Sequence, residues 1–183
     1  MATIYYPGGC PVLDGGYLNN CCPGKELARI RHVWYQKPSF NFSNPLDPAE
    51  WTAAILNGDV IVVLNVRGSS DGGTWTEEDG FGNKPTTITA FEEVATYTDQ
   101  NFLFGNVANY NAFVRGDWRF GYCTETMAFL FDESASIKPT KPVSEDIKQA
   151  VYGVIEVKIV QDEMPIPFIY PEEIFEECFQ VVE

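Results

Sequence analysis

The chain has 183 residues, of which 45% are hydrophobic and 21% are charged, proportions that suit one globular domain with a buried core. It carries 26 acidic and 12 basic residues, which give a net charge of -14. Because such a charge repels phosphate backbones and anionic lipids, it disfavours direct reading of nucleic acid and docking on a membrane.

This charge is divided unevenly along the chain. Residues 1–40 hold four basic and two acidic groups, a net of +2, which leaves 8 basic and 24 acidic groups, a net of -16, for the remainder. The basic groups of the first segment are Lys25, Arg29, Arg31 and Lys37. A basic segment of this kind can contact an acidic neighbour, including another copy of the chain.

Glycines and prolines punctuate residues 1–46, which show little periodicity. We therefore expect residues 1–46 to form an extended N-terminal arm and residues 47–183 to form a β-rich assembly domain. Within the arm, residues 30–35 alternate loosely between apolar and polar side chains. They form either a strand or a part of the arm that becomes ordered only against a neighbour.

The first regular element after the arm is a short amphipathic helix over residues 48–57. Asp47 can cap it, Pro48 suits its first position, and Glu50 completes a capping box. Gly58 then supplies the stop signal.

A β-branched run over residues 59–67 predicts a strand that is buried on both faces. Residues 68–82 are rich in glycine and acids, which predicts a long loop, and residues 86–97 are rich in strand formers. We expect the two strands to pair as an antiparallel unit joined by this loop. Trp75 and Phe81 lie on the loop, where large aromatic side chains suit a partner's pocket.

Further along, residues 100–115 predict a helix that Asp99 caps. Its apolar face would carry Leu103, Val107, Tyr110 and Val114. Residues 118–131 predict two strands that meet near residues 124–125. A linker is predicted over residues 138–142, and a further strand over residues 150–160.

The C-terminal stretch from Asp162 holds seven acidic residues and no basic one. Its prolines exclude a regular helix over residues 164–171, and residues from 172 onward predict a final acidic turn or helix. Apolar residues such as Phe175 alternate with the acids. Two interpretations stay open: a solvated face, or docking on the basic segment 25–37 of a neighbouring copy.

These elements predict a mainly β fold, since strands do not alternate regularly with helices. The expected architecture is an antiparallel β-sandwich or a partly closed barrel, with one or two short flanking helices and long loops.

No motif predicts catalysis or a cofactor. His32 is the only histidine and has no partner pattern, and the glycines match neither phosphate-binding signature. The five cysteines, Cys21 and Cys22 among them, lack C-x-x-C spacing, so we expect reduced thiols and no metal site. The acids at 71–79 lack the spacing of a calcium loop. We therefore predict that the chain is not an enzyme and has no catalytic, cofactor-binding or metal-binding residues.

The candidate functional residues are instead interface residues, chosen for aromatic or basic character in these segments. They are Trp75, Phe81, Trp34, Arg29, Arg31 and Phe175.

About the last two-thirds of the chain resembles virion structural proteins of tailed bacteriophages, especially those of crAss-like phages. The stretches that carry the likeness are diffuse: residues 67–73, 80–84, 100–114, 137–159 and 171–175. None is a signature with known roles, so no functional residue is carried over. The resemblance implies a sandwich or barrel that builds cyclic oligomers through sheet edges and long loops.

Three functions are therefore considered. The first is a structural subunit of a phage particle, in a ring, tail-tube-like or capsid-associated role, which contacts copies of itself and other virion proteins. The alternative is a carbohydrate-binding or adhesive module, because clustered aromatic rings suit sugars, and a hydrolase with a carboxylate pair ranks last. The sequence shows neither a signal-peptide pattern nor an apolar run of about 20 residues. We therefore expect the chain to reside in the virion, which is assembled in the host cytoplasm.

Overall fold

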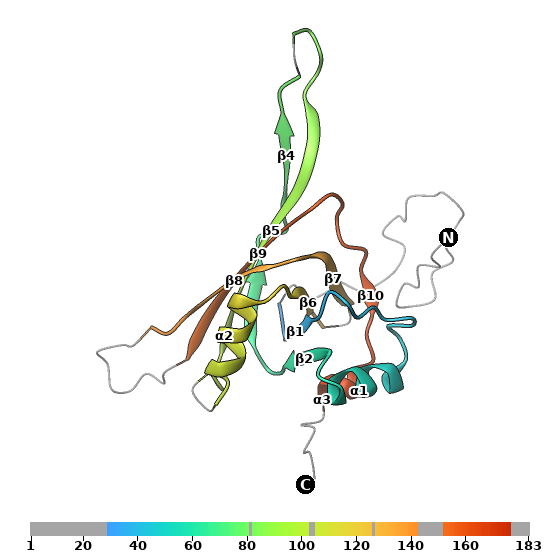
Figure 1. Cartoon of the computed structure of the whole chain (residues 1–183), viewed down its shortest axis with the longest axis vertical. Helices are drawn as coiled ribbons and strands as arrows, with labels where there is room; N and C mark the ends of the chain where they lie inside the picture. Colours follow the sequence, from blue (N-terminus) through green and yellow to red (C-terminus); the bar gives the residue numbers. More distant parts are fainter. Residues whose placement is uncertain (1–28, 81, 103–104, 126, 143–151, 177–183) are drawn as a thin grey trace.

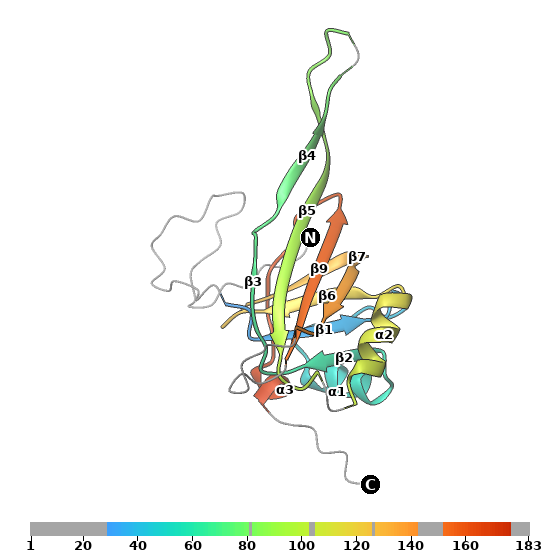
Figure 2. The same ribbon diagram turned by 90° about the vertical axis from the view of Figure 1, so that its left-hand side faces the viewer.

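The computed structural model describes residues 29–80, 82–102, 105–125, 127–142 and 152–176. Two five-stranded antiparallel sheets pack together as a sandwich that does not close into a barrel (Figures 1 and 2). Three short helices lie at its margins. Of the two predicted architectures the sandwich is confirmed, with one more helix than expected.

Sheet B has the strand order β10-β7-β6-β1-β2. Its strands are β1 (His32–Gln36), β2 (Val60–Val63), β6 (Arg119–Cys123), β7 (Met127–Ser134) and β10 (Phe168–Ile169). All five residues of β1 are buried, and the strand pairs with β2 on one side and β6 on the other. The strand interpretation of residues 30–35 is therefore confirmed, and this part of the predicted arm belongs to the sandwich. Residues 1–28 lie outside the described residues.

Sheet A has the order β3-β5-β9-β8, and β4 also pairs with β5. Its strands are β3 (Arg67–Ser70), β4 (Thr74–Glu78), β5 (Thr87–Asp99), β8 (Ser136–Thr140) and β9 (Gly153–Gln161). The predictions of strands at 86–97 and 150–160 are confirmed, as are the two strands that meet at 124–125.

Three predictions about these strands were wrong. Residues 68–82 contain β3 and β4 rather than only a loop, because both strands pair with the long strand β5. The expected linker contains the end of β8, an edge strand that tolerates Pro139 without losing an internal ladder bond. Finally, β2 and β5 do not pair. Asn65, with φ at 57°, separates β2 in sheet B from β3 in sheet A.

Helix α1 (Pro48–Leu56) begins and ends close to the predicted residues. The Asp47 carboxylate accepts a hydrogen bond from the backbone N–H of Ala49 at 2.9 Å. Glu50 does not close the predicted capping box, because its carboxylate accepts from the N–H groups of Ser43 and Asn44 instead. These bonds lower the pKa of the Glu50 carboxyl group.

Helix α2 (Val107–Arg115) is shorter than predicted, and α3 (Glu172–Glu176) confirms the helical ending. Asp99 does not cap α2, because it is the buried last residue of β5. Gly105, with φ at 85°, precedes the helix. Of the predicted apolar face, Tyr110 is buried, together with Phe113, whereas Val107 and Val114 are exposed. Leu103 lies outside the described residues.

Two hydrophobic clusters cover the two faces of sheet B, and they hold most of the aromatic residues that the structure describes. The larger cluster lies between the sheets and includes Tyr35, Tyr97 and Phe120. The smaller cluster lies between sheet B and helices α1 and α3, and includes Trp34 and Trp51. Since successive side chains of a strand point to opposite faces, two covered faces bury every residue of β1.

Candidate functional site

A chain of buried hydroxyl groups links the two sheets to helix α2. The Tyr35 and Tyr97 hydroxyl oxygens lie 2.5 Å apart, and the Tyr97 hydroxyl donates to that of Tyr110 at 3.3 Å. The Tyr110 hydroxyl in turn donates to Asp99 Oδ2 at 2.9 Å. Burial raises the pKa of all three tyrosines, so each hydroxyl keeps its proton and acts as a structural hydrogen-bond donor.

A cavity of about 280 Å³ lies beside this chain, between β2 and α2. Its wall combines apolar side chains of β2 with several amide side chains. The lining residues are Ile61, Val62, Val63, Leu64, Asn65, Asp99, Asn101, Asn106, Asn109, Tyr110 and Phe113.

Replacing Tyr97 by phenylalanine is expected to destabilise the fold by about 1–3 kcal/mol, because it removes the central hydroxyl and leaves Tyr35 without its side-chain partner. Urea unfolding measures this change. Tyr152, which is only half-buried, supplies the control, and Tyr152→Phe is expected to change stability by less than about 0.5 kcal/mol. Equal effects of the two variants would show that the hydroxyl chain contributes nothing.

The histidine and the described cysteine do not form a catalytic pair. His32 Nδ1 accepts a hydrogen bond from the Asn65 backbone N–H at 3.1 Å, while the Cys123 thiol contacts the His32 carbonyl oxygen rather than the imidazole. Burial raises the pKa of Cys123 to about 12. Burial and then the neighbouring Arg31 lower the pKa of His32 to about 4. At neutral pH the thiol is therefore protonated and the imidazole is neutral, and the two groups do not contact each other. Both side chains contribute to the packing of the core.

Glu93 is a buried carboxylate between the sheets, and two hydroxyl groups contact it. It accepts hydrogen bonds from Ser70 Oγ and, at 2.8 Å, from the Tyr122 hydroxyl. Within the described residues, no three His, Cys, Asp or Glu side chains are grouped to hold a metal ion.

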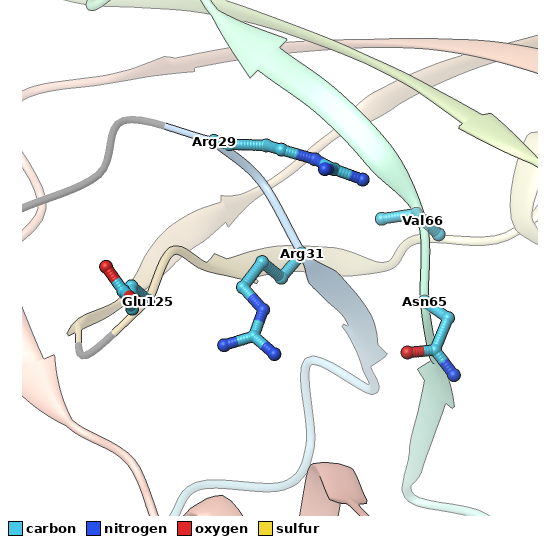
Figure 3. A pocket seen from close by; sticks show the side chains of 5 residues that line it. All are labelled: Arg29, Arg31, Asn65, Val66 and Glu125. Atoms are coloured by element: carbon cyan, nitrogen blue, oxygen red, sulfur yellow. The ribbon is translucent and has the colours of Figure 1, made fainter.

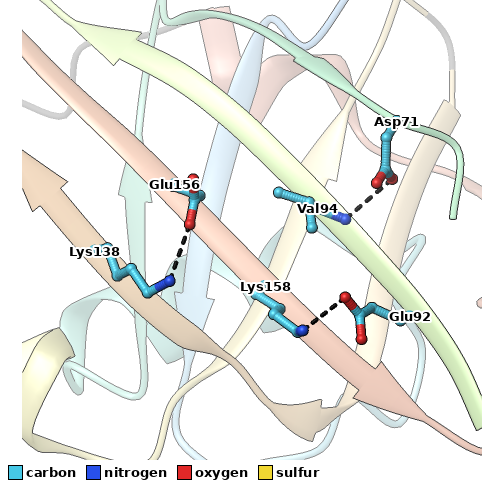
Figure 4. Close-up of polar contacts among 6 residues, drawn as sticks. All are labelled: Asp71, Glu92, Val94, Lys138, Glu156 and Lys158. Atoms are coloured by element: carbon cyan, nitrogen blue, oxygen red, sulfur yellow. Dashed lines mark hydrogen bonds and ion pairs between the residues drawn. The ribbon is translucent and has the colours of Figure 1, made fainter.

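The outer face of sheet A is covered by polar contacts between strands (Figure 4). Lys158 pairs with Glu92 at 2.6 Å, and Lys138 pairs with Glu156 at 3.1 Å. Asp71 Oδ1 accepts from the N–H groups of Val94 and Gly73, which fixes the bend between β3 and β4. Exposed pairs of this kind add little stability.

Two of the predicted interface residues cannot contact a partner from the folded chain. Trp34 is fully buried, and Phe175 is 3% exposed. The two rings lie 6.1 Å apart in the cluster beneath α1 and α3. They were selected for aromatic character, which is equally typical of a core. Phe81 lies outside the described residues.

Trp75, which is 43% exposed, lies at the base of a projecting hairpin rather than at a loop tip. Its ring packs on Phe91, with 5.1 Å between the ring centroids. The opposite strand β9 pairs with β5 only from Phe91 onward. Residues 87–90 therefore pair with β4 alone, and both strands rise away from the sandwich as a two-stranded ribbon (Figures 1 and 2).

This β4–β5 hairpin is exposed on both faces. Every residue of β4 and the first three residues of β5 are exposed, including Ile88 at 58%. Glu77, Glu78 and Asp79 lie towards its tip, and none has an ion-pair partner in the described part of the chain. The loop prediction missed this hairpin, although alternating Thr residues in both strands were a usable signal.

The remaining predicted interface residues, Arg29 and Arg31, are exposed and lie together at an open pocket of about 480 Å³ (Figure 3). Asn65, Val66 and Glu125 also line this arginine pocket. The charge of the first segment indicated the two arginines. The other three lining residues come from distant turns that only the fold brings near them.

Comparison with protein-family models, with curated proteins and with solved structures finds no significant match to this chain. The resemblance to phage virion proteins therefore stays a prediction. In the part of the chain that is described, no helix combines the length and the apolar character needed to span a bilayer.

Proposed function

We propose that this chain is a structural subunit of a phage particle, in a ring, tail-tube-like or capsid-associated role. It acts without catalysis, through contacts with copies of itself and with other virion proteins, and it resides in a virion assembled in the host cytoplasm. The observation that carries this proposal is the β4–β5 hairpin, which extends beyond the rest of sheet A and is exposed on both faces.

The hairpin supports a role in assembly for an energetic reason. An isolated two-stranded ribbon is at best marginally stable in water, because it has no core to cover either face. Ile88 and Trp75 nevertheless place large apolar surfaces there. A neighbouring subunit that covers the hairpin would bury these side chains and satisfy its free strand edge.

The test is to shorten the hairpin without disturbing its base. Residues 77–89 are replaced by Asn-Gly, which joins Thr76 to its cross-strand partner Ala90 in a tight turn. We expect the melting temperature to change by only a few degrees, since the described residues among those removed are almost all exposed. We also expect the oligomers that native mass spectrometry detects for the intact chain to disappear.

Electron microscopy of the intact chain is expected to show rings or short tubes, and mass spectrometry of purified phage particles is expected to detect the chain. A chain that is strictly monomeric at all concentrations and absent from particles would refute the proposal.

The carbohydrate-binding alternative gains no specific support. Such a site needs a platform of exposed rings, but Trp34 and Trp51 are fully buried and Trp118 is half-buried. Trp75 is exposed, and its ring contacts Phe91 at the base of the hairpin. We therefore do not propose this function.

A further inference from the structure

The arginine pocket presents two cations on a rigid base. The Arg31 N–H donates to the Cys123 carbonyl at 2.9 Å, and the Arg31 carbonyl accepts from the Val66 N–H at 2.9 Å. Next to it, Ile30 exchanges two backbone hydrogen bonds with Gly68. The backbone of Ile30 and Arg31 is therefore fixed by hydrogen bonds on both sides, and Arg29 is the next residue along the chain.

In the described part of the chain, the guanidinium groups of Arg29 and Arg31 have no carboxylate at ion-pair distance, although Glu125 also lines the pocket. Figure 3 shows the two side chains extending along different sides of the pocket from one segment. Each guanidinium offers five N–H donors in a planar fork, which suits carboxylates.

The hairpin tip presents the complementary charge on a complementary shape. Glu77, Glu78 and Asp79 are consecutive and exposed, and they stand on a ribbon only two strands wide. Among the described residues, none of the three has an ion-pair partner. The hairpin rises away from the sandwich (Figures 1 and 2). The described residues that line the pocket all belong to other segments, so the hairpin of a chain does not fill the pocket of the same chain.

We infer that the arginine pocket of one chain receives the acidic β4–β5 hairpin tip of a second copy of the chain. This contact rests on the proposed structural role and identifies a partner for it. Because pocket and tip are different surfaces, the contact is heterologous, and its repetition gives a closed ring or an open tube. In this contact, arginines of the basic first segment of one chain meet acidic residues from the remainder of another chain.

Two charge-reversed chains test the contact. The pocket-reversed chain carries Arg29→Glu and Arg31→Glu, and the hairpin-reversed chain carries Glu77→Lys and Glu78→Lys. When either variant is present alone, the tip and the pocket that meet at each contact carry charges of the same sign. We therefore expect association to weaken by more than about tenfold. In an equimolar mixture, acidic tips meet arginine pockets and lysine tips meet glutamate pockets. The mixture is therefore expected to restore oligomers in which the two chains alternate.

A control matched to the pocket-reversed chain carries Arg115→Glu and Lys141→Glu. These substitutions change the net charge by the same amount as the pocket reversal, but at exposed residues outside the pocket. Native mass spectrometry and mass photometry of full-length chains measure assembly, and circular dichroism confirms that each variant is folded. The control is expected to assemble like the unmodified chain.

The outcomes separate this contact from the proposed function. If the unmodified chain assembles but both reversed chains assemble equally well, or if the mixture stays monomeric, the contact is wrong and the structural role survives. If reversal at the pocket matters and reversal at the hairpin does not, another acidic partner occupies the pocket and the contact is again wrong. If the unmodified chain never assembles, the contact is wrong, and the structural role fails as well if the chain is also absent from phage particles.

Discussion

Replacing Trp34 by alanine is expected to lower the free energy of unfolding by about 3–5 kcal/mol, the range typical of deleting a large buried aromatic side chain. Trp34 is fully buried in sheet B, and its ring meets that of Trp51 edge-on at 5.3 Å. It also lies directly over Gly121 of the neighbouring strand. A Cβ built on Gly121 would come within 2.2 Å of the indole ring.

The comparison between Trp34 and Trp75 makes this prediction specific. Trp75→Ala is expected to cost less than about 1 kcal/mol, because the ring is 43% exposed and contacts only the base of the hairpin. Trp34→Phe retains most of the packing and removes an indole N–H that has no hydrogen-bond partner among the described residues, so it is expected to cost less than half as much as Trp34→Ala. Urea unfolding at pH 7 measures all three variants. Similar costs at the two tryptophans would contradict the described core.

Trp34 also shows why sequence patterns did not separate core from interface. A strand covered on both faces has no alternation, so His32–Gln36 carries no signal that distinguishes burial in one chain from burial between chains. The long strands β5 and β9 were predictable, because their alternating apolar side chains face one core. The start of α1 was predictable from its own capping residues.

The elements that sequence reasoning missed are held by partners distant in the chain. Strand β3 is Arg67–Ser70 and β8 contains Pro139, and neither segment favours a strand by itself. Both are fixed by ladders to β5 and β9. The chain passes from β2 in sheet B to β3 in sheet A at Asn65, whose φ angle is positive. The periodicity of apolar residues does not predict such a backbone conformation.

In the candidate site, too, the charges were predictable from the sequence and their positions were not. Arg29 and Arg31 were predictable because net charge is a property of sequence. The pocket was not, because it forms where the extended segment before β1 meets two distant turns, at residues 65–66 and at Glu125. The acids of the hairpin were visible in the sequence as a group. That they stand on a projecting ribbon depends on β5 being longer than β9 at one end. Charge could be predicted, and its placement could not.

Acidification from pH 7 to pH 5 is expected to reduce stability by about 2 kcal/mol through His32 alone. Its pKa is about 4 in the folded chain, against an ordinary value of 6.5. Between these values the unfolded chain binds a proton that the folded chain does not, so stability falls as the pH falls. Above about pH 6.5 both states hold a neutral imidazole, and this contribution is fully present.

The structural cause of this dependence lies in the two contacts of the imidazole. Its Nδ1 accepts a hydrogen bond from the Asn65 N–H, and protonation would remove that acceptor. Its ring packs on Phe175 at 5.5 Å between centroids, and a charge there would lie buried beside Arg31. Protonation is therefore expected to loosen the packing of α3 on sheet B.

Two measurements check this prediction independently. Because the chain contains one histidine, its proton NMR signal needs no assignment among several, and its titration gives the folded pKa directly. Urea unfolding at pH 7 and pH 5 gives the change in stability, and His32→Asn serves as the control, since its side-chain oxygen can still accept from Asn65 but does not titrate. The difference between the two chains isolates the imidazole from the carboxylates, which also begin to bind protons near pH 5. A folded pKa near 6.5, or the same loss of stability in His32→Asn, would show that burial of this side chain does not couple folding to pH.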